Sequence, residues 1–387
     1  MIGKYAIINF YYEIPFRLEL IRKGVIMHMA DALLAPAVAA TMYAASGTAA
    51  GLSVKKLTKD ENTQKLPTMA VASALVFAGQ MINYTIPGTG SSGHMCGGML
   101  LSALLGPQAG FLSMIVVLTI QCLFFADGGL MALGANIWNM AFYGCFVGYY
   151  LIWRQIMKSN LFGNMEPRKA QRARIIAASL IGCVVTLQMG AFSVVLETTL
   201  SGITELPFGA FCALMQPIHL AIGIVEGLIT AAVLTYVYET RPELIRDVDL
   251  TSQSAEGRNS KPLGVVIFTL AMLVVLVGGV FSHFASGNPD GLEWALFGNE
   301  EAGYSANMGL DEENFGVSSQ VADSAASIQE KTSFLPDYAF ADSDSAMGTT
   351  VSGIVGSAMV AAAALAICFA GRFFKKRRPE DLGPAVK

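Results

Sequence analysis

Long apolar runs without a single charge are the feature that most restricts how this chain folds. Residues 106–126, GPQAGFLSMIVVLTIQCLFFA, are one such run. About 20 apolar residues match a helix that crosses a bilayer, whereas barrel strands need only about 9–11 residues. Backbone polar groups in lipid must also bond within their own segment or within a closed barrel. With only 14% of the residues charged, we expect an all-α, polytopic transmembrane helical bundle.

Nine apolar segments are expected to be helical, the third of them as a short re-entrant helix. They form about seven N-terminal spans followed by a two-span C-terminal unit. Their expected ranges are 34–54, 68–86, 95–105, 108–126, 130–153, 175–196, 208–238, 263–284 and 350–370.

Lysine and arginine residues gather in alternate loops, and this pattern predicts an orientation. They are concentrated at 55–65, 154–174, 241–261 and 371–378, whereas the loops between these are almost free of them. Cytoplasmic loops of membrane proteins carry such an excess of basic residues. The pattern predicts a multi-pass protein of the inner (plasma) membrane, with the N-terminus outside and the C-terminus in the cytoplasm.

A polar stretch at 241–262 divides the chain and is expected to be a cytoplasmic linker. The other expected parts are residues 1–26 as an N-terminal extension, 27–240 as the larger membrane unit, 263–378 as a two-helix unit and 379–387 as a cytoplasmic tail. The two-helix unit carries an outside loop, 285–348, with twelve Asp or Glu residues against one basic residue. Such a loop is either a solvated, partly flexible segment or a surface that attracts cations or a docking partner.

The Met27–His28 dipeptide is the first candidate metal-binding element. If Met27 is the first residue, its amine, the Met27–His28 amide and the His28 imidazole Nδ1 close two fused chelate rings. Square-planar nitrogen donors of this kind suit Ni(II) or Cu(II), and Co(II) is compatible with them. The chelate requires that residues 1–26 be absent, either because the start codon is that of Met27 or because a leader is removed.

A glycine-rich stretch at 85–101, TIPGTGSSGHMCGGMLL, carries the second candidate, His94. Glycine adopts backbone conformations that other residues avoid, so the chain is expected to turn sharply here. Irregular backbone at membrane depth persists only where it is buried in protein or lines a cavity. His94 is therefore a candidate fourth nitrogen ligand, ahead of the softer Met95 and Cys96, and the alternative is a structural histidine.

Five further polar residues lie in or beside the apolar segments. They are Asp127 in an outer turn, Asn136 and Asn139 in the fifth segment, and His219 and Glu226 in the seventh. Polar groups inside a membrane are costly and commonly functional. We interpret them as residues that orient the ligand imidazoles, line the pocket or assist the ion. The alternative is hydrogen bonding between helices.

Motifs of several other protein classes are missing from the sequence. There is no G-x-x-x-x-G-K-[ST] phosphate-binding loop and no H-E-x-x-H zinc-protease motif. The six cysteines form no C-x-x-C pair, which argues against a disulfide framework. No nucleophile with an acid–base partner can be identified, so we expect a protein that is not an enzyme and does not bind nucleic acid.

Four motifs together resemble a known family. MHMADALLAP, GTGSSGHMCGGML, FFADGGLMALGANIWNM and PIHLAIGIVEGLITA resemble the substrate-capture (S) membrane component of energy-coupling-factor (ECF) cobalt/nickel transporters, the CbiM/NikM family. ASGNPDGLEWAL, IQEKTSFLPDYAF and GTTVSGIVGSA in the C-terminal unit resemble its small CbiN/NikN, or PDGL-type, partner. The resemblance covers about residues 27–378.

The resemblance implies a function, ligands and partners. It implies uptake of Co²⁺, for cobalamin biosynthesis, or of Ni²⁺; the fused two-helix unit favours cobalt. Met27 and His28 would chelate the ion, His94 would be the distal ligand, and Asn136 and Asn139 would lie near the pocket. A transmembrane coupling (T) subunit and ATP-binding cassette ATPase subunits would drive transport. The 26 extra residues depart from the family pattern, and a rival interpretation is a membrane metal sensor or assembly protein that binds without transport.

Overall fold

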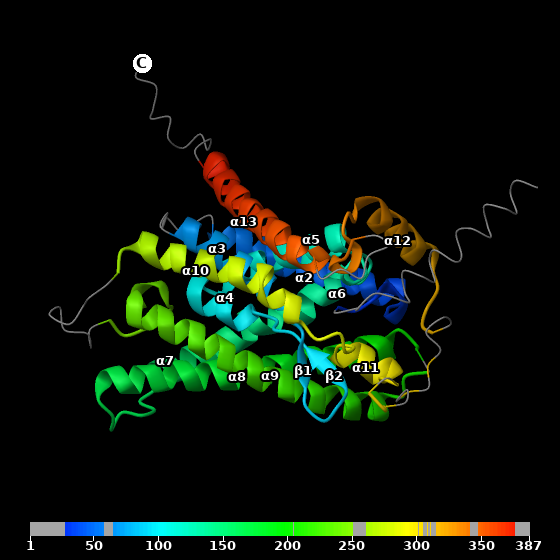
Figure 1. Ribbon diagram of the computed structural model, residues 1–387, viewed down its shortest axis with the longest axis horizontal. Helices are drawn as coiled ribbons and strands as arrows, with labels where there is room; N and C mark the ends of the chain where they lie inside the picture. The colour runs from blue at the N-terminus through cyan, green and yellow to red at the C-terminus, as the bar shows by residue number, and fades with distance from the viewer. Residues whose placement is uncertain are drawn as a thin grey trace, which may run out of the picture.

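The computed structural model is almost entirely helical (Figure 1). It describes residues 28–57, 65–203, 205–250, 261–300, 302–304, 308, 310, 315–340 and 347–375. Met27 and the extension before it therefore lie outside the described residues.

The larger unit consists of helices and one small hairpin. In chain order these are η1 (Asp31–Leu33), α2 (Pro36–Leu57), α3 (Lys65–Gln80), β1 (Tyr84–Ile86), β2 (Ser91–Gly93), α4 (Gly98–Leu105), α5 (Pro107–Phe125), α6 (Leu133–Asn136), the π-helix η2 (Ile137–Trp153), α7 (Arg154–Lys158), α8 (Pro167–Leu200), α9 (Phe208–Thr240) and η3 (Pro242–Leu244). The second unit contains α10 (Leu263–Gly279), η5 (Phe281–Phe284), α11 (Gly291–Phe297), α12 (Gln320–Thr332), η6 (Pro336–Tyr338) and α13 (Met347–Lys375).

The polytopic helical prediction is confirmed. Six helices are long and apolar enough to cross a membrane, and Pro67–Gln80 is a shorter apolar helix. Each of the nine predicted segments coincides with helical structure. The orientation inferred from the basic loops stays a prediction.

The second predicted segment was too long, because its helix stops well before residue 86. Helix α3 ends at Gln80, and Tyr84–Ile86 pairs with Ser91–Gly93 as an antiparallel hairpin. Ile86 precedes Pro87, and a residue before proline is disfavoured in the helical conformation. The predicted short helix also begins later, at Gly98, after Gly97 takes a left-handed conformation with φ 84°.

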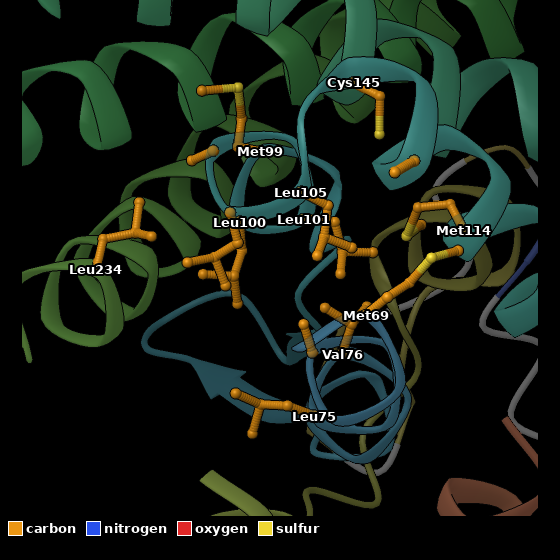
Figure 2. Close-up of a cluster of buried hydrophobic side chains, with 14 of the residues drawn as sticks. Met69, Leu75, Val76, Met99, Leu100, Leu101, Leu105, Met114, Cys145 and Leu234 are labelled. Atoms are coloured by element: carbon orange, nitrogen blue, oxygen red, sulfur yellow. The ribbon is translucent and has the colours of Figure 1, made fainter. Parts of the chain in front are cut away.

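Helix α4 lies at the centre of the larger unit, and all of its residues are buried. At about 12 Å it is too short to span a bilayer. Its apolar side chains pack among those of α3, α5, η2 and α9 (Figure 2). Gly98 and Gly144 face one another, and a Cβ on Gly144 would lie 2.9 Å from the Gly98 Cα. The two glycines therefore allow α4 and η2 to cross in backbone contact.

The second unit packs along one side of the larger unit. Helices α10 and α13 lie beside α3 in Figure 1, and α13 also contacts α5. The described parts of the acidic loop include α11, which contacts α9 and β2, and α12, which contacts α5. Because Leu292, Trp294 and Leu296 of α11 are buried, this part of the loop packs on protein rather than lying free in solvent.

Candidate functional site

The chain before α2 is held against the turn between α5 and α6. The Asn136 side chain accepts a hydrogen bond from the Met29 amide at 3.0 Å and donates one to the Met29 carbonyl at 3.1 Å. The Gly129 amide donates to the same carbonyl at 3.0 Å. Asn136 therefore fixes the backbone directly after His28, which is 3% exposed.

His28 presents one ring nitrogen to a carboxylate and the other to the interior. Its Nδ1 atom lies 2.8 Å from Asp127 Oδ1. The Nε2 atom is buried and has no hydrogen-bond partner among the described residues. Burial lowers the pKa of His28, but the nearby negative charge of Asp127 raises it, and the net effect is a raised pKa.

His94 follows the hairpin and faces His28. The two ring centroids are 5.4 Å apart, and the rings are close to perpendicular at 75°. His94 Nδ1 donates to the Met95 carbonyl oxygen at 3.2 Å. Just beyond it, Glu226 accepts hydrogen bonds from the amides of Cys96 at 2.7 Å and Gly97 at 2.9 Å. The glycine-rich stretch thus places an imidazole deep in the protein.

A cavity of about 90 Å³ brings most of the predicted site residues together. Those that line it are His28, His94, Asn136, Asn139, His219 and Glu226. Asp127 lies behind the His28 ring rather than in the wall, and Met27 falls outside the described residues. Within the part of the chain that the structure describes, no three His, Cys, Asp or Glu side chains form a ready-made metal cluster.

The remaining polar residues of the cavity are bonded to protein. Asn139 donates its amide N–H to Glu197 at 2.8 Å, and its Oδ1 atom has no hydrogen-bond partner among the described residues. The His219 Nδ1 donates to the Met215 carbonyl of its own helix at 2.8 Å. Glu226 bonds the backbone before α4. These contacts match the alternative of hydrogen bonding within and between helices.

The second unit supplies part of the cavity wall, which was not predicted from the sequence. Asp290, Gly291 and Leu292 line the cavity beside His28 and His94. Asp290 caps α11, because its Oδ1 accepts from the amides of Leu292 and Glu293, both at 2.8 Å. Burial raises the pKa of Asp290 to about 7. An Asp directly before a helix is a capping signal, but such a signal does not locate the helix against a distant cavity.

The backbone around Asp290 is tied to the strand that leads to His94. Ser92 donates from its amide to the Pro289 carbonyl at 2.8 Å. Its hydroxyl donates to the Asn288 carbonyl, also at 2.8 Å. The two units therefore share one cavity wall and are joined by hydrogen bonds at its edge.

Two family descriptions match the chain, one for each unit. Residues 28–244 match the family described as cobalt uptake substrate-specific transmembrane region, CbiM. Residues 264–372 match the PDGLE domain.

Similar proteins of known name cover most of the chain. A putative fused nickel transport protein NikMN of Archaeoglobus fulgidus is 34% identical over 88% of this chain and 98% of its own length. A fused nickel transport protein NikMN of Rhodobacter capsulatus is 30% identical over 87% of this chain and 95% of its own. A crystal structure of a truncated transition metal transporter, 33% identical, covers 55% of this chain and 99% of its own, with a TM-score of 0.47.

Proposed function

Because the chain belongs to the CbiM family and carries a PDGLE domain, we propose that it captures Ni²⁺ or Co²⁺ for an energy-coupling-factor transporter. The observation that carries this proposal is the pair of imidazoles, His28 and His94, in one buried cavity. Imidazole nitrogen is a donor that suits nickel, cobalt and copper, whereas Mg²⁺ and Ca²⁺ prefer oxygen. The chain is a transporter component and not an enzyme.

The environment of His28 supports a metal-binding role for its Nε2 atom. A metal-bound histidine commonly donates its other ring N–H to a carboxylate, which fixes the ring and makes the ligand more basic. Asp127 Oδ1 lies 2.8 Å from His28 Nδ1 in the described structure. The chelate inferred from the sequence needs Nδ1, because only that ring nitrogen can close a chelate ring with the Met27–His28 amide. We therefore propose Nδ1 as the donor when the chain begins at Met27 and Nε2 when it does not, with a ring nitrogen of His94 in either case.

Met27 supplies the remaining nitrogens of the proposed chelate if the chain begins there, namely its free amine and the Met27–His28 amide. Mass spectrometry of the purified, transport-competent protein should find a terminus at Met27. Recovery of an active protein that keeps residues 1–26 would exclude the amine as a ligand without removing the two imidazoles.

Nickel is the cargo that we propose first. The resemblance favoured cobalt on the basis of the fused second unit, but two relatives that match most of both units are named nickel transport proteins. Nitrogen donors alone do not separate the two ions. Competition of Co²⁺ against bound Ni²⁺ on the purified protein tests the choice, and preferential retention of Co²⁺ would reverse it.

Energy for transport must come from other subunits, since the sequence contains no phosphate-binding loop for ATP. We propose a transmembrane coupling subunit and ATP-binding cassette ATPases as partners. Helix α2 is a candidate contact for the coupling subunit, because it buries only Ala39, Ser46 and Ser53. Its small residues would permit close helix packing.

The decisive experiment measures ion uptake in cells that make this chain with and without the coupling and ATPase subunits. Radioactive Ni²⁺ should accumulate only when all subunits are present. A membrane metal sensor, the rival function, would bind Ni²⁺ without any uptake that depends on the partners. Uptake that is equal with and without the ATPases would refute the proposed transporter.

A further inference from the structure

Helix α4, whose first residues Gly98 and Met99 line the cavity, is bounded by a glycine with positive φ at each end. Gly97 before it has φ 84°, and Gly106 after it has φ 88°. The chain turns sharply at both glycines, and glycine restricts the direction of the backbone less than any other residue. The position of this short helix therefore depends on the groups that bind its two ends.

The end of α4 at the cavity is bound by Glu226 of α9. Its carboxylate accepts hydrogen bonds from the amides of Cys96 and Gly97 at 2.7 and 2.9 Å. Neither amide can bond within α4, because both precede the helix. Cys96 lies two residues after His94, so this carboxylate also fixes the backbone that carries the imidazole.

The other end of α4 is bound by Arg246, which follows α9 and η3. The Arg246 amide donates to the Ala103 carbonyl at 2.8 Å, and its guanidinium Nη2 donates to the Leu105 carbonyl at 3.0 Å. The last four carbonyls of a helix have no amide partner within the helix, and α4 ends inside the protein, where Leu105 is 3% exposed. One residue thus bonds two of these four carbonyls.

Arg246 is itself fixed by its surroundings. Its carbonyl accepts a hydrogen bond from Trp153 Nε1 at 3.1 Å. The carboxylate of the next residue, Asp247, accepts the Tyr149 hydroxyl at 2.8 Å, and the residue before it, Ile245, is buried. Residues 245–247 are therefore packed into the larger unit, although they belong to the stretch expected to be a linker.

We propose that Arg246 is a positioning residue for His94 that acts through α4, an inference that rests on the proposed ion-binding function and deepens it. Glu226 and Arg246 belong to α9 and its direct continuation, and they hold α4 between them. A helix of about 12 Å is stiff, so a shift at its Arg246 end displaces residues 96–97 and with them His94. The two bonded ends keep His94 beside His28, with ring centroids 5.4 Å apart.

The arrangement connects the ion site with the opposite end of the larger unit. Lys158 lies 3.5 Å from Asp247, so Arg246 is on the side where basic residues gather, which is predicted to be cytoplasmic. A partner that displaces Arg246 would lower the affinity for the ion, and by linkage the bound ion would oppose that displacement equally. Subunits on that side could thus act on the ligand His94 without touching the cavity.

The test compares Arg246→Met with the unmodified full chain in lipid nanodiscs. Methionine removes the charge and the side-chain donors, while the backbone amide can still bond the Ala103 carbonyl. Without metal, hydrogen–deuterium exchange of peptides that cover residues 94–105 should become faster, because one end of α4 is released. Ni²⁺ binding should weaken by about fivefold, the lower end of the coupling typical of distant sites.

Arg241→Met is the matched control, and Arg246→Lys is the rescue. Arg241 also follows α9, but its guanidinium donates to the Lys261 carbonyl at 3.1 Å rather than to α4. This control should leave both the exchange at 94–105 and the Ni²⁺ affinity unchanged. Arg246→Lys keeps a cationic donor for the Leu105 carbonyl and should retain most of the affinity. A lysine variant as impaired as the methionine variant would assign the effect to packing and overturn the proposal.

Three further outcomes would overturn it. The first is an Arg246→Met protein with the exchange and affinity of the unmodified chain. The second is an equal effect of Arg241→Met. The third is exchange that becomes faster throughout the protein, which would mean a general loss of packing rather than the release of α4.

Tyr149→Phe is the milder variant to use if Arg246→Met does not fold. It removes only the hydrogen bond to Asp247 and should also speed exchange at 94–105, so unchanged exchange there would contradict the proposal. If the unmodified protein does not bind Ni²⁺ at all, the proposed function fails, whereas the exchange measured without metal still tests the hold of Arg246 on α4.

Discussion

The two units contribute different chemistry to the cavity. Residues of the larger unit present the imidazoles of His28 and His94, which lie edge to face. The second unit adds oxygen atoms, namely the carboxylate of Asp290 in the wall and the hydroxyl of Tyr338 behind Asp127. One unit thus carries nitrogen donors, and the other carries groups that surround and orient them.

The difference indicates how an ion could be selected. Hard cations such as Mg²⁺ and Ca²⁺ need several oxygen ligands, but the carboxylates at this cavity already accept hydrogen bonds. Asp290 Oδ1 accepts two amides of α11, and Glu226 accepts the amides of Cys96 and Gly97. Ions that accept imidazole nitrogen are therefore favoured, and the oxygen groups contribute mainly charge and geometry.

The largest loss of Ni²⁺ affinity is expected when an imidazole of the larger unit is removed. His28→Ala or His94→Ala removes one of the two imidazoles and should weaken Ni²⁺ binding by more than about 100-fold, beyond the range typical of outer partners. Calorimetric titration of the purified chain measures the change. His283→Ala is the control, because His283 is exposed in η5 and does not line the cavity. Unchanged affinity in both cavity variants would remove the proposed site.

The next largest effect is expected at Asp127, the carboxylate that lies between His28 and Tyr338. Asp127→Asn keeps the size of the side chain but removes the charge that faces His28 Nδ1. We expect Ni²⁺ affinity to fall by about 10- to 100-fold, as for other carboxylate partners of metal-binding histidines. Asp323→Asn, at an exposed carboxylate of α12, should have no effect. An Asp127→Asn protein that binds as tightly as the unmodified chain would show that His28 needs no such partner.

The same comparison separates what the sequence could predict from what it could not. The helices of both units were predictable, because apolar length and charge distribution are local properties of a segment. His28, His94 and Glu226 could also be singled out, since charged or polar side chains at membrane depth are rare enough to stand out, and all three line the cavity. The hairpin after Gln80 was missed because its strands are short and lie beside an apolar run.

The contribution of the second unit to the site could not be predicted from local patterns. Asp290 and Tyr338 lie in an acidic loop whose composition is typical of a solvated segment. The positions of these two residues depend on contacts with residues far away in the chain, such as Ser92 with Pro289 and Tyr338 with Asp127. Nothing in the residue pattern of either partner specifies the other.

The smallest expected effect is on the oxygen side, at Asp290. Burial raises the pKa of this carboxyl to about 7, so it is mostly neutral at about pH 6 and mostly ionised at about pH 8. Asp290→Asn keeps a good helix cap for α11, because Asn and Asp are about equally effective at that position. The variant therefore removes the charge beside the cavity with little cost to the fold.

If the Asp290 charge interacts weakly with the ion, the effect of Asp290→Asn on Ni²⁺ affinity should depend on pH. At about pH 8 the unmodified chain should bind Ni²⁺ roughly threefold more tightly than Asp290→Asn, the scale of a single screened charge interaction. At about pH 6 the two proteins should bind nearly alike, because Asp290 is then mostly protonated in the unmodified chain. Titrations of both proteins at the two pH values measure the ratio. A much larger loss at both pH values would mean that Asp290 is itself a ligand, and the division between a nitrogen-donating unit and an orienting unit would not hold.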